Sequence, residues 1–271
     1  MSESKFRAFS RRFSWFWRFS PWRPEGEPFR LNARRVDAIE RLTWAPCESA
    51  VIICDMWETH WCRRAAQRCS VLAPDLERFA RATRERGALV IHAPSDTMSY
   101  YSGMPQRERA RRVRAVQPPL PIRMRPVNLK REVELPIIDS DGGCDDEPPS
   151  TYKPPPPWKR QHPAIVIAEN DIISDDGNEI YSVLVRNGIK NIFMTGVHIN
   201  KCVLARPFGI RQMVMLGMNV LLVRDLTDSL YNPAMPPKVS HDQGTRLMVE
   251  HIEKYWCPST TSEDVISSLG E

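Results

Sequence analysis

Five short apolar runs recur along this chain and restrict its fold more than any other feature of the sequence. They are rich in aliphatic residues and lack the regular alternation of polar and apolar positions that a half-exposed strand shows. Such runs are typical of strands in parallel sheets, which are covered on both faces. The runs span Ser49–Cys54, Ala88–His92, Ala164–Ala168, Asn191–Val197 and Asn219–Val223.

Helix-compatible segments separate these runs. The spacing of apolar residues predicts helical structure between the first two runs, divided at Pro74 and ended by Gly87. Ser174 or Asp175 can cap another helix, and residues 29–42 predict a lead-in with a short helix. Alternating strands and helices predict an α/β fold, a three-layer, doubly wound sandwich around a mostly parallel sheet.

The 271 residues suit one large domain with additions. We expect residues 29–260 to form this domain, with a Pro-rich insert at 118–163 that is either an active-site cover or disordered. A tail is expected at 261–271, and a basic, aromatic extension at 1–28. The extension is either disordered or a docking segment, or it makes weak contact with a membrane surface through residues 1–24.

Composition excludes several classes of protein. The net charge of +5 gives no fold-wide footprint for nucleic acid, and no segment is long and apolar enough to span a bilayer. The N-terminal extension lacks the aliphatic core of a signal peptide. Seven cysteines at irregular spacing, with no CxxC pair, predict neither a zinc module nor a disulfide framework. They favour a reducing, cytoplasmic location.

One segment, Thr195–Val203, places a cysteine directly after a predicted buried strand. Unpaired N–H groups at the start of the following helix would stabilise a thiolate, so Cys202 is a candidate nucleophile, with a buried structural cysteine as the alternative. Function collects at the carboxyl ends of parallel strands, where Asp55 and Glu169 also fall.

Two segments resemble the isochorismatase-like (nicotinamidase-related) cysteine hydrolases. Val51–Trp57 resembles the first strand of that family, which ends in a catalytic Asp, and Thr195–Val203 resembles its nucleophile segment. The resemblance extends from Cys47 to Trp256, the Pro-rich insert excepted. It implies a six-stranded parallel sheet and a homo-oligomer that uses no cofactor. It also implies hydrolysis of an amide-like C–N bond in a small molecule through a Cys thioester (acyl-enzyme) intermediate.

The resemblance assigns roles to particular residues. Cys202 would be the nucleophile and Asp55 the acid/base that accepts its proton. The backbone N–H groups of His198 and Cys202 would form an oxyanion hole, aimed by a cis peptide bond between Val197 and His198. Candidate residues of the substrate pocket are Trp57, His60, Asp96 and Phe208. The segment after the nucleophile, Arg206–Gly209, interrupts the helix that the family continues, and Phe208 could instead face a partner subunit.

Glu169 departs from the family pattern, because it stands where the family has the Lys of an Asp-Lys-Cys triad. A carboxylate beside Asp55 would raise a pKa and discourage the thiolate. Three outcomes follow. Asp55 and Glu169 share a proton, or another Lys such as Lys159 or Lys201 enters the site, or the chain is a catalytically impaired binding or scaffold protein.

Metal binding is not expected. The family's metal-binding branch uses an Asp-x-His pair after the second strand, and the corresponding segment His92–Met98 contains none. The acidic segment Asp139–Glu147 lacks the flanking helices and the spaced Glu of a calcium loop.

Overall fold

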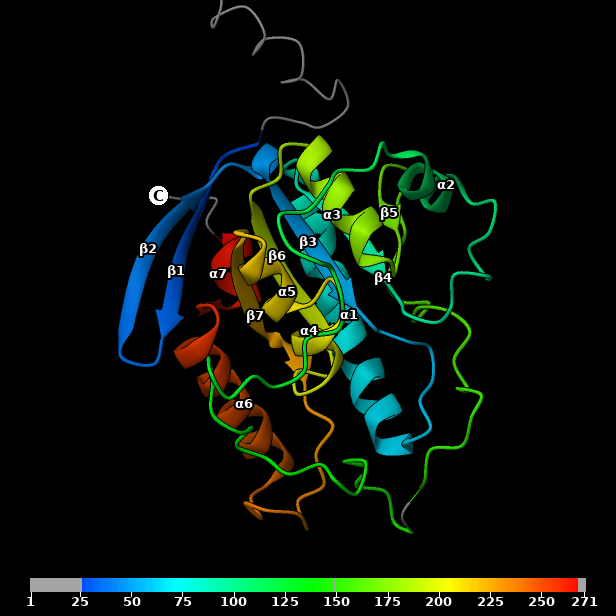
Figure 1. The fold of residues 1–271 in the computed structure, drawn as a ribbon, viewed down its shortest axis with the longest axis vertical. Coiled ribbons are helices and arrows are strands. Elements are labelled where there is room, and N and C mark those ends of the chain that lie inside the picture. Colours follow the sequence, from blue (N-terminus) through cyan, green and yellow to red (C-terminus); the bar gives the residue numbers. More distant parts are fainter. Residues whose placement is uncertain (1–25, 149, 268–271) are drawn as a thin grey trace, which may run out of the picture.

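The computed structural model describes residues 26–148 and 150–267, which form a three-layer α/β structure (Figure 1). Its centre is one eight-stranded sheet with the order β2-β1-β8-β7-β6-β3-β4-β5. The strands are β1 (Phe29–Arg35), β2 (Ala38–Trp44), β3 (Ser49–Cys54), β4 (Leu89–Ala93), β5 (Ile172–Ile173), β6 (Asn191–Val197), β7 (Asn219–Asp228) and β8 (Ser259–Thr260). The α/β class and the mostly parallel sheet are confirmed.

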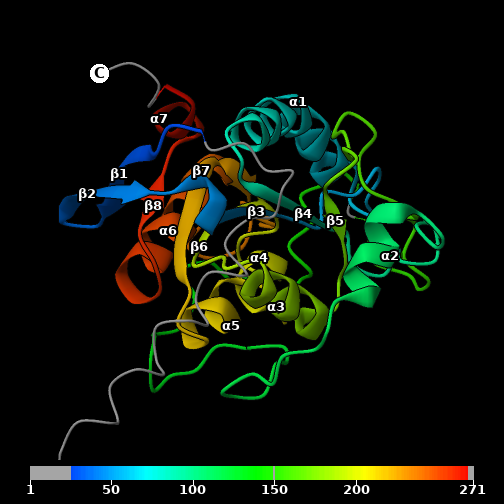
Figure 2. The same cartoon turned by 90° about the horizontal axis from the view of Figure 1, so that it is seen from above.

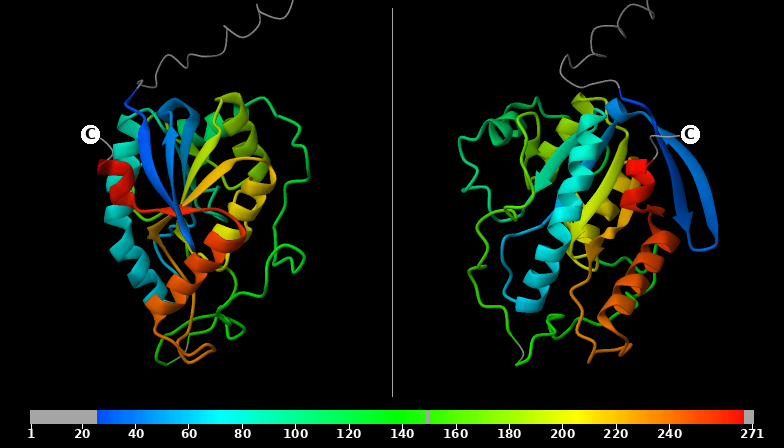
Figure 3. Two further views of the ribbon diagram at one scale, coloured as in Figure 1. Left: turned by 90° about the vertical axis from the view of Figure 1, so that its left-hand side faces the viewer. Right: turned by 180° about the vertical axis from the view of Figure 1, so that it is seen from behind.

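The sheet has eight strands where we expected six. The strands from β8 to β5 are parallel to their neighbours, whereas β1 pairs antiparallel with both β2 and β8. The hairpin β1–β2 therefore extends the parallel part at one edge of the sheet (Figure 3).

Helices cover both faces of the sheet (Figure 2). They are α1 (Arg63–Glu85), α2 (Pro105–Arg112), α3 (Gly177–Arg186), α4 (Cys202–Ala205), α5 (Ile210–Met215), α6 (His241–Tyr255) and α7 (Ser262–Ser267), with a 3-10 turn, η1, at Pro46–Glu48. α1 and α7 pack on the face to which Val51 and Ile53 point, and α3 to α6 pack on the face of Ala50 and Ile52. Because successive residues of β3 enter opposite clusters, the strand has no polar face, as its sequence predicted.

The lead-in helix predicted between residues 29 and 42 is wrong. Phe29, Leu31 and Ala33 alternate into the core from β1. Val36 and Ile39, whose spacing suggested a helix, are 50% and 69% exposed. The buried residues recur at every second position, as in a strand, and not at every third or fourth, as in a helix.

The predicted break at Pro74 is also wrong, because α1 continues through it. Ala73 and Leu76 on either side are fully buried, so packing against the sheet maintains the helix despite the missing N–H. Gly87, with φ +105°, follows the helix end as expected. The next helix is capped by Asp176, whose side chain accepts hydrogen bonds from two backbone N–H groups, and not by Ser174 or Asp175.

The third predicted strand, Ala164–Ala168, is irregular in the structure. The Val166 N–H donates to the side chain of Glu77, 2.8 Å away, and the Val166 side chain is 54% exposed. The edge of the sheet is formed instead by the short strand β5, which pairs with β4. We expected Glu169 to follow the third strand, but in the structure it precedes β5, the strand that occupies this edge.

The two ends of the predicted domain differ in what the structure describes. The N-terminal segment 1–25 lies outside the described residues, so the predicted extension and its membrane contact are untested. At the other end, the predicted tail includes α7, where Val265 is fully buried and the Ser262 N–H donates to Asp225. No helix among residues 26–148 and 150–267 is long and apolar enough to cross a membrane.

The Pro-rich insert passes along the outside of the helices, drawn in green in Figure 3. Its described residues between 118 and 160 contain no helix or strand. Backbone hydrogen bonds nevertheless attach it to the domain, from Arg125 N to Ala205 O at 2.8 Å and from Ile138 N to Pro236 O at 3.0 Å.

Candidate active site

The loop that follows β6 carries the predicted nucleophile. β6 ends at Val197, the Val197–His198 peptide bond is cis, and α4 begins at Cys202. Gly196 has φ +97°, and a Cβ there would lie 2.0 Å from the carbonyl oxygen of Cys54. Glycine thus allows β6 to approach β3 closely, and the loop leaves Cys202 partly exposed beyond the carboxyl edge of the sheet.

Two backbone N–H groups of this loop are available to a ligand. The carbonyl of His198 accepts hydrogen bonds from Lys201 N at 2.9 Å and Val203 N at 3.2 Å, which fix the turn. Within the described part of the chain, the N–H groups of His198 and Cys202 themselves have no acceptor. Unpaired donors beside a nucleophile are what an oxyanion hole requires.

Asp55 comes from the end of the neighbouring strand, β3. It is fully buried and has a φ of 49°, in the left-handed region. Its Oδ1 accepts a hydrogen bond from Ser95 N at 2.7 Å, and its Oδ2 accepts one from Arg206 Nε at 3.1 Å. The carboxylate is therefore held from two sides, by the loop after β4 and by the helix of the nucleophile.

Arg206 is the residue that our reading of the sequence missed. It lies at the end of α4, four positions after Cys202, and forms ion pairs with Asp55 and with Asp96 at 3.1 and 3.3 Å. Both Asp55 and Arg206 act on the Cys202 thiol, Asp55 raising its pKa and Arg206 lowering it. Residues four apart share one face of a helix, so this spacing was the available signal. We had interpreted Arg206 only as part of a helix interruption.

The pKa shifts describe a thiol and a carboxyl group in one desolvated site. Burial raises the pKa of the Cys202 thiol, and the charge of Asp55 raises it further, while Arg206 lowers it. Burial also raises the pKa of Asp55, against the lowering effects of Arg206 and of the hydrogen bonds from Cys202 and Ser95. The resting site thus holds a neutral thiol beside a carboxyl group whose pKa is raised overall, with Arg206 opposing that shift.

Glu169 does not lie beside Asp55, so its predicted place in the site is wrong. Its side chain is exposed, and its backbone carbonyl accepts a hydrogen bond from Arg109 at 3.0 Å. The cause is the irregular path before β5, which turns the segment away from the end of β3. Asp55 and Glu169 therefore share no proton in this structure.

Neither lysine considered as a substitute completes the site. Lys201 pairs with Asp139 of the insert at 2.9 Å, and Lys159 is exposed. The cation that faces both Cys202 and Asp55 is Arg206.

Aromatic side chains gather next to the nucleophile loop. Trp57 stacks on Trp158 of the insert with ring centroids 4.1 Å apart, and His60 stacks on the same Trp158 at 5.5 Å. The His60 ring also meets the edge of His198 at 5.1 Å. Burial lowers the pKa of His60 to about 4 and lowers that of His198, so both rings are neutral near pH 7. Trp57 and His60 thus form a cluster beside the nucleophile loop.

Of the two remaining candidates for the substrate pocket, Asp96 lies at the site and Phe208 does not. Asp96 is half-exposed and pairs with Arg206, so it lies at the site. Phe208 is fully buried in the hydrophobic core beneath the sheet, and its predicted role in the pocket is wrong. The turn at Gly209 places the ring against α3 to α6 rather than toward Cys202.

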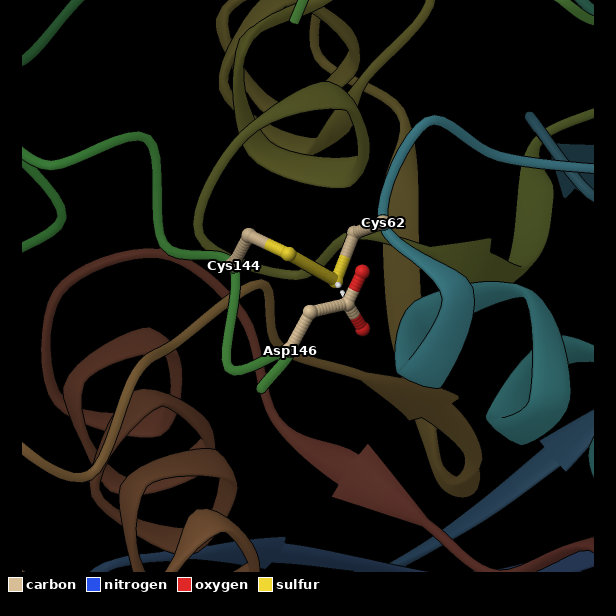
Figure 4. Close-up of side chains that lie close together, drawn as sticks. All are labelled: Cys62, Cys144 and Asp146. Atoms are coloured by element: carbon tan, nitrogen blue, oxygen red, sulfur yellow. Dashed lines mark hydrogen bonds between the residues drawn. A yellow bond between two sulfur atoms is a disulfide. The ribbon is translucent and has the colours of Figure 1, made fainter. Parts of the chain in front are cut away.

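A disulfide joins Cys62 to Cys144 (Figure 4). The sequence predicted no disulfide framework and gave no sign of this single pair, which weakens the inference of a reducing compartment drawn from the cysteine pattern. The irregular spacing hid the pair, because the two residues are 82 positions apart and meet only through the path of the insert. Asp146 lies beside this pair, with one carboxylate oxygen within 4.8 Å of both sulfurs, close enough for the three residues to be considered as metal ligands. With the two sulfurs bonded to each other, this group offers a metal no thiolate.

The acidic segment Asp139–Asp146 connects the insert to the candidate site. Asp139 accepts a hydrogen bond at 2.8 Å from Nδ2 of Asn200, two positions before Cys202. Asp145 pairs with Arg68, and Arg68 pairs in turn with Asp228 at the end of β7, each at 2.9 Å. The insert thus packs against the loop of Cys202 and is not free of the domain.

The parallel sheet, with Cys202 and Asp55 beyond neighbouring strand ends, defines the isochorismatase-like fold. Comparison with solved structures agrees. A cysteine hydrolase from Pseudomonas syringae pv. phaseolicola 1448A aligns over 88% of this chain and 96% of its own, with 16% identity and a TM-score of 0.52. An isochorismatase from Pseudomonas putida KT2440 aligns over 82% of this chain and 91% of its own, with 12% identity and a TM-score of 0.49.

A third structure, an isochorismatase-like hydrolase from Alkaliphilus metalliredigens, aligns over 83% of this chain and 98% of its own, with 14% identity and a TM-score of 0.48. No protein-family model matches the sequence, and no curated protein matches it. At these identities the similarity concerns the fold, so any activity has to be inferred from the site.

Proposed function

We propose that this protein is a small-molecule hydrolase that cleaves an amide-like C–N bond through a thioester on Cys202. The observation that carries the proposal is the convergence of three side chains from two elements. Cys202 begins α4, Arg206 follows its end and Asp55 follows β3, with Arg206 Nε 3.1 Å from Asp55 Oδ2 and both charges acting on the pKa of Cys202. A thiol, a base and a cation in one desolvated site are the components of an activated nucleophile.

The proposed reaction begins when Asp55 accepts the proton of Cys202 as the sulfur attacks the carbonyl carbon. The carbonyl oxygen becomes an oxyanion, which the N–H groups of His198 and Cys202 stabilise. Oxyanion donors of this kind each contribute about 3 kcal/mol to lowering a barrier. Protonated Asp55 then gives its proton to the leaving nitrogen, and the C–N bond breaks to leave a thioester.

Hydrolysis of the thioester reverses these roles. Asp55 accepts a proton from water, the resulting hydroxide attacks the thioester carbon, and the thiol departs with the proton that Asp55 returns. Arg206 cannot exchange protons in this cycle, because a guanidinium remains charged at any physiological pH. Its proposed role is to lower the pKa of Asp55 and of Cys202 and to hold the carboxylate in place.

The binding or scaffold alternative was motivated by Glu169 in the position of a cation. Arg206 supplies a cation from another element, so that motive no longer applies. A homo-oligomeric assembly, a cytoplasmic location and membrane contact through residues 1–24 stay predictions from the sequence.

The first prediction tests the nucleophile. Cys47 is exposed and free, so it would react with alkylating reagents and has to be removed first. In a Cys47→Ser background, we expect one equivalent of iodoacetamide to modify Cys202 and to abolish turnover in a screen of small amides and ureides. Peptide mass spectrometry locates the adduct.

Cys202→Ala should lose turnover by several orders of magnitude, while Cys257→Ala, at a buried thiol that the mechanism does not use, should retain it. Normal turnover by Cys202→Ala would show that Cys202 is not the nucleophile.

A further inference from the structure

A concave pocket of about 570 Å³ lies outside the candidate active site, between the insert, α5 and the end of α6. Residues 123–130 of the insert form one wall, Arg211 and Met215 of α5 form another, and Trp256 closes the pocket beside them. Neither the proposed reaction nor the aromatic cluster near Cys202 uses any of these side chains.

The pocket is strongly cationic. Arg123, Arg125, Lys130 and Arg211 all line it, and no carboxylate does. In the part of the chain that the structure describes, Arg123, Arg125 and Lys130 form no ion pair with an acidic side chain. Arg125 donates only to neutral oxygens, among them Gln212 Oε1 at 2.7 Å. Three positive charges therefore face one concave surface without a counter-charge.

Arg211 adds a buried donor without an acceptor. The residue is 2% exposed, its Nη2 donates to Glu132 at 2.8 Å and its Nη1 to the carbonyl of Arg125 at 3.0 Å. Its Nε is buried and has no hydrogen-bond partner. Buried donors in folded proteins nearly always have a partner, so the Arg211 guanidinium keeps unused donor capacity in the wall of the pocket.

Glu132 does not neutralise the rest of the pocket. Its Oε2 accepts hydrogen bonds from Arg211, from His251 Nε2 at 2.9 Å and from Trp256 Nε1 at 2.8 Å. Its Oε1 accepts from Asn128 N at 3.2 Å, so the carboxylate is engaged by four donors and none of them is Arg123, Arg125 or Lys130. The charges of Arg123, Arg125 and Lys130 are left to interact with something outside the chain.

Apolar surface lies next to these charges. Met215 and Trp256 line the pocket, and at its rim Met124 and Leu129 are 49% and 67% exposed. A free inorganic ion would leave Met124 and Leu129 in water, whereas a ligand with an apolar body would cover them.

We propose that this pocket binds a small organic anion, a carboxylate or phosphate monoester attached to an apolar or aromatic body. The acidic group lies among Arg123, Arg125 and Lys130, in front of Arg211, and the apolar body rests on Met215, Met124 and Leu129. This site is distinct from that of the proposed hydrolase, and its occupancy requires no turnover.

Calorimetric titration of the full chain carrying Cys202→Ala tests the proposal without interference from catalysis. The probes are 2-naphthyl phosphate, 2-naphthoate and the neutral 2-naphthylmethanol. We expect both anions to bind with one-to-one saturation, at least tenfold more tightly than the alcohol, and to weaken as salt rises. Failure of the hydrolase proposal would not alter this result, because binding alone is measured.

Charge reversal locates the site. Arg123 and Lys130 are exposed and unpaired, so Arg123→Glu with Lys130→Glu should preserve the fold and weaken both anions at least tenfold. Arg81→Glu, at an exposed position on α1 across the sheet, is the matched control and should leave affinity unchanged. Equal loss in the control, or no loss in the double variant, would overturn the assignment.

Three further outcomes would also overturn it. Inorganic phosphate binding as tightly as naphthyl phosphate would remove the apolar component of the site. Binding to vesicles of anionic phospholipid, with no binding of the soluble anions, would make this face a membrane contact. A dimer that dissociates only in the double variant would make it an interface between copies of the chain.

Discussion

Arg206 shows how one residue changes the chemistry that the sequence indicated. Glu169 appeared to replace a cation with an anion, which would have opposed formation of a thiolate. In the structure, the guanidinium of Arg206 lies 3.1 Å from the carboxylate of Asp55 and lowers the pKa of Cys202. Its side chain is 22% exposed, so solvent screens the interaction only in part. Under the proposed mechanism, Arg206 thus supplies from another position in the chain the charge that the expected Lys would have supplied.

The second prediction concerns this charge and needs no known substrate. Arg206 lowers the pKa of Cys202, so Arg206→Ala should raise it and leave less thiolate at any pH below it. In the Cys47→Ser background, we expect iodoacetamide to modify Cys202 at least tenfold more slowly, a change of about 1.4 kcal/mol. Arg206→Lys keeps the charge and should restore most of the rate.

The matched control is Arg111→Ala, because Arg111 is exposed on α2 and contacts neither Cys202 nor Asp55. Once a substrate is known, the acid limb of kcat/KM should move to higher pH in Arg206→Ala, since Arg206 also lowers the pKa of Asp55. An unchanged alkylation rate and pH profile would mean that Arg206 has only a structural role.

At the scale of secondary-structure elements, α1 begins with a cap supplied by a distant segment. The side chain of its N-cap residue, Cys62, accepts no hydrogen bond from the N–H groups of the first turn. Instead, the carboxylate of Asp146 accepts hydrogen bonds from the N–H groups of Arg63 and Arg64, each at 2.9 Å. Negative charge at this end also complements the helix dipole. The helix start and the insert therefore stabilise each other.

The third prediction follows from this cap. Burial tends to raise the pKa of Asp146, but the hydrogen bonds from Ser150, Arg63 and Arg64 outweigh it and bring the pKa to about 2. An ionised cap stabilises the fold above the ordinary pKa of an Asp and loses that effect as the pH falls toward 2. We expect Asp146→Asn to lower the free energy of unfolding by about 1 kcal/mol at pH 7.

Urea denaturation at several pH values measures this difference. It should shrink as the pH falls from 5 to 2, because the wild-type cap becomes protonated. Asp141→Asn, which removes a carboxylate from the same segment without touching α1, should show little dependence of this kind. A difference that does not vary with pH would argue against the charged cap.

At the scale of the whole molecule, the parallel part of the sheet was predictable from the sequence, whereas the edge strands and the disulfide were not. The buried runs at β3, β4, β6 and β7 have the continuous apolar character that parallel strands require, so their positions and their parallel pairing could be inferred from the sequence. The position of Cys202 after β6 followed from the same pattern.

Three features depend on contacts between distant segments, and local pattern could not supply them. The hairpin β1–β2 has one largely exposed strand, so its spacing resembled a helix. The run before β5 is apolar but forms its hydrogen bonds with side chains rather than with β4. The disulfide joins cysteines 82 positions apart, and no local rule pairs them.

The fourth prediction tests that disulfide. With Cys62 and Cys144 paired, five cysteines are free, Cys47, Cys54, Cys69, Cys202 and Cys257. Under denaturing, non-reducing conditions we expect five alkylated thiols by mass spectrometry, and seven after reduction. Closing a loop of this length stabilises a fold by up to about 4 kcal/mol.

Reduction should therefore lower the unfolding midpoint and speed proteolysis within the Pro-rich insert. Cys62→Ser with Cys144→Ser should reproduce both effects without a reductant, and reductant should then add nothing. Seven free thiols in protein kept under air, or equal proteolysis of both forms, would contradict the pairing.

The position of Arg206 on the nucleophile's own helix has a consequence for the opposite edge of the sheet. When a strand must deliver a catalytic lysine, its length and its exit direction are constrained by the reaction. Here β5 delivers no such group, and a strand of two residues is sufficient. Sequence drift at that edge is therefore limited by folding alone, while any insertion or deletion between Cys202 and Arg206 would separate the sulfur from its counter-charge.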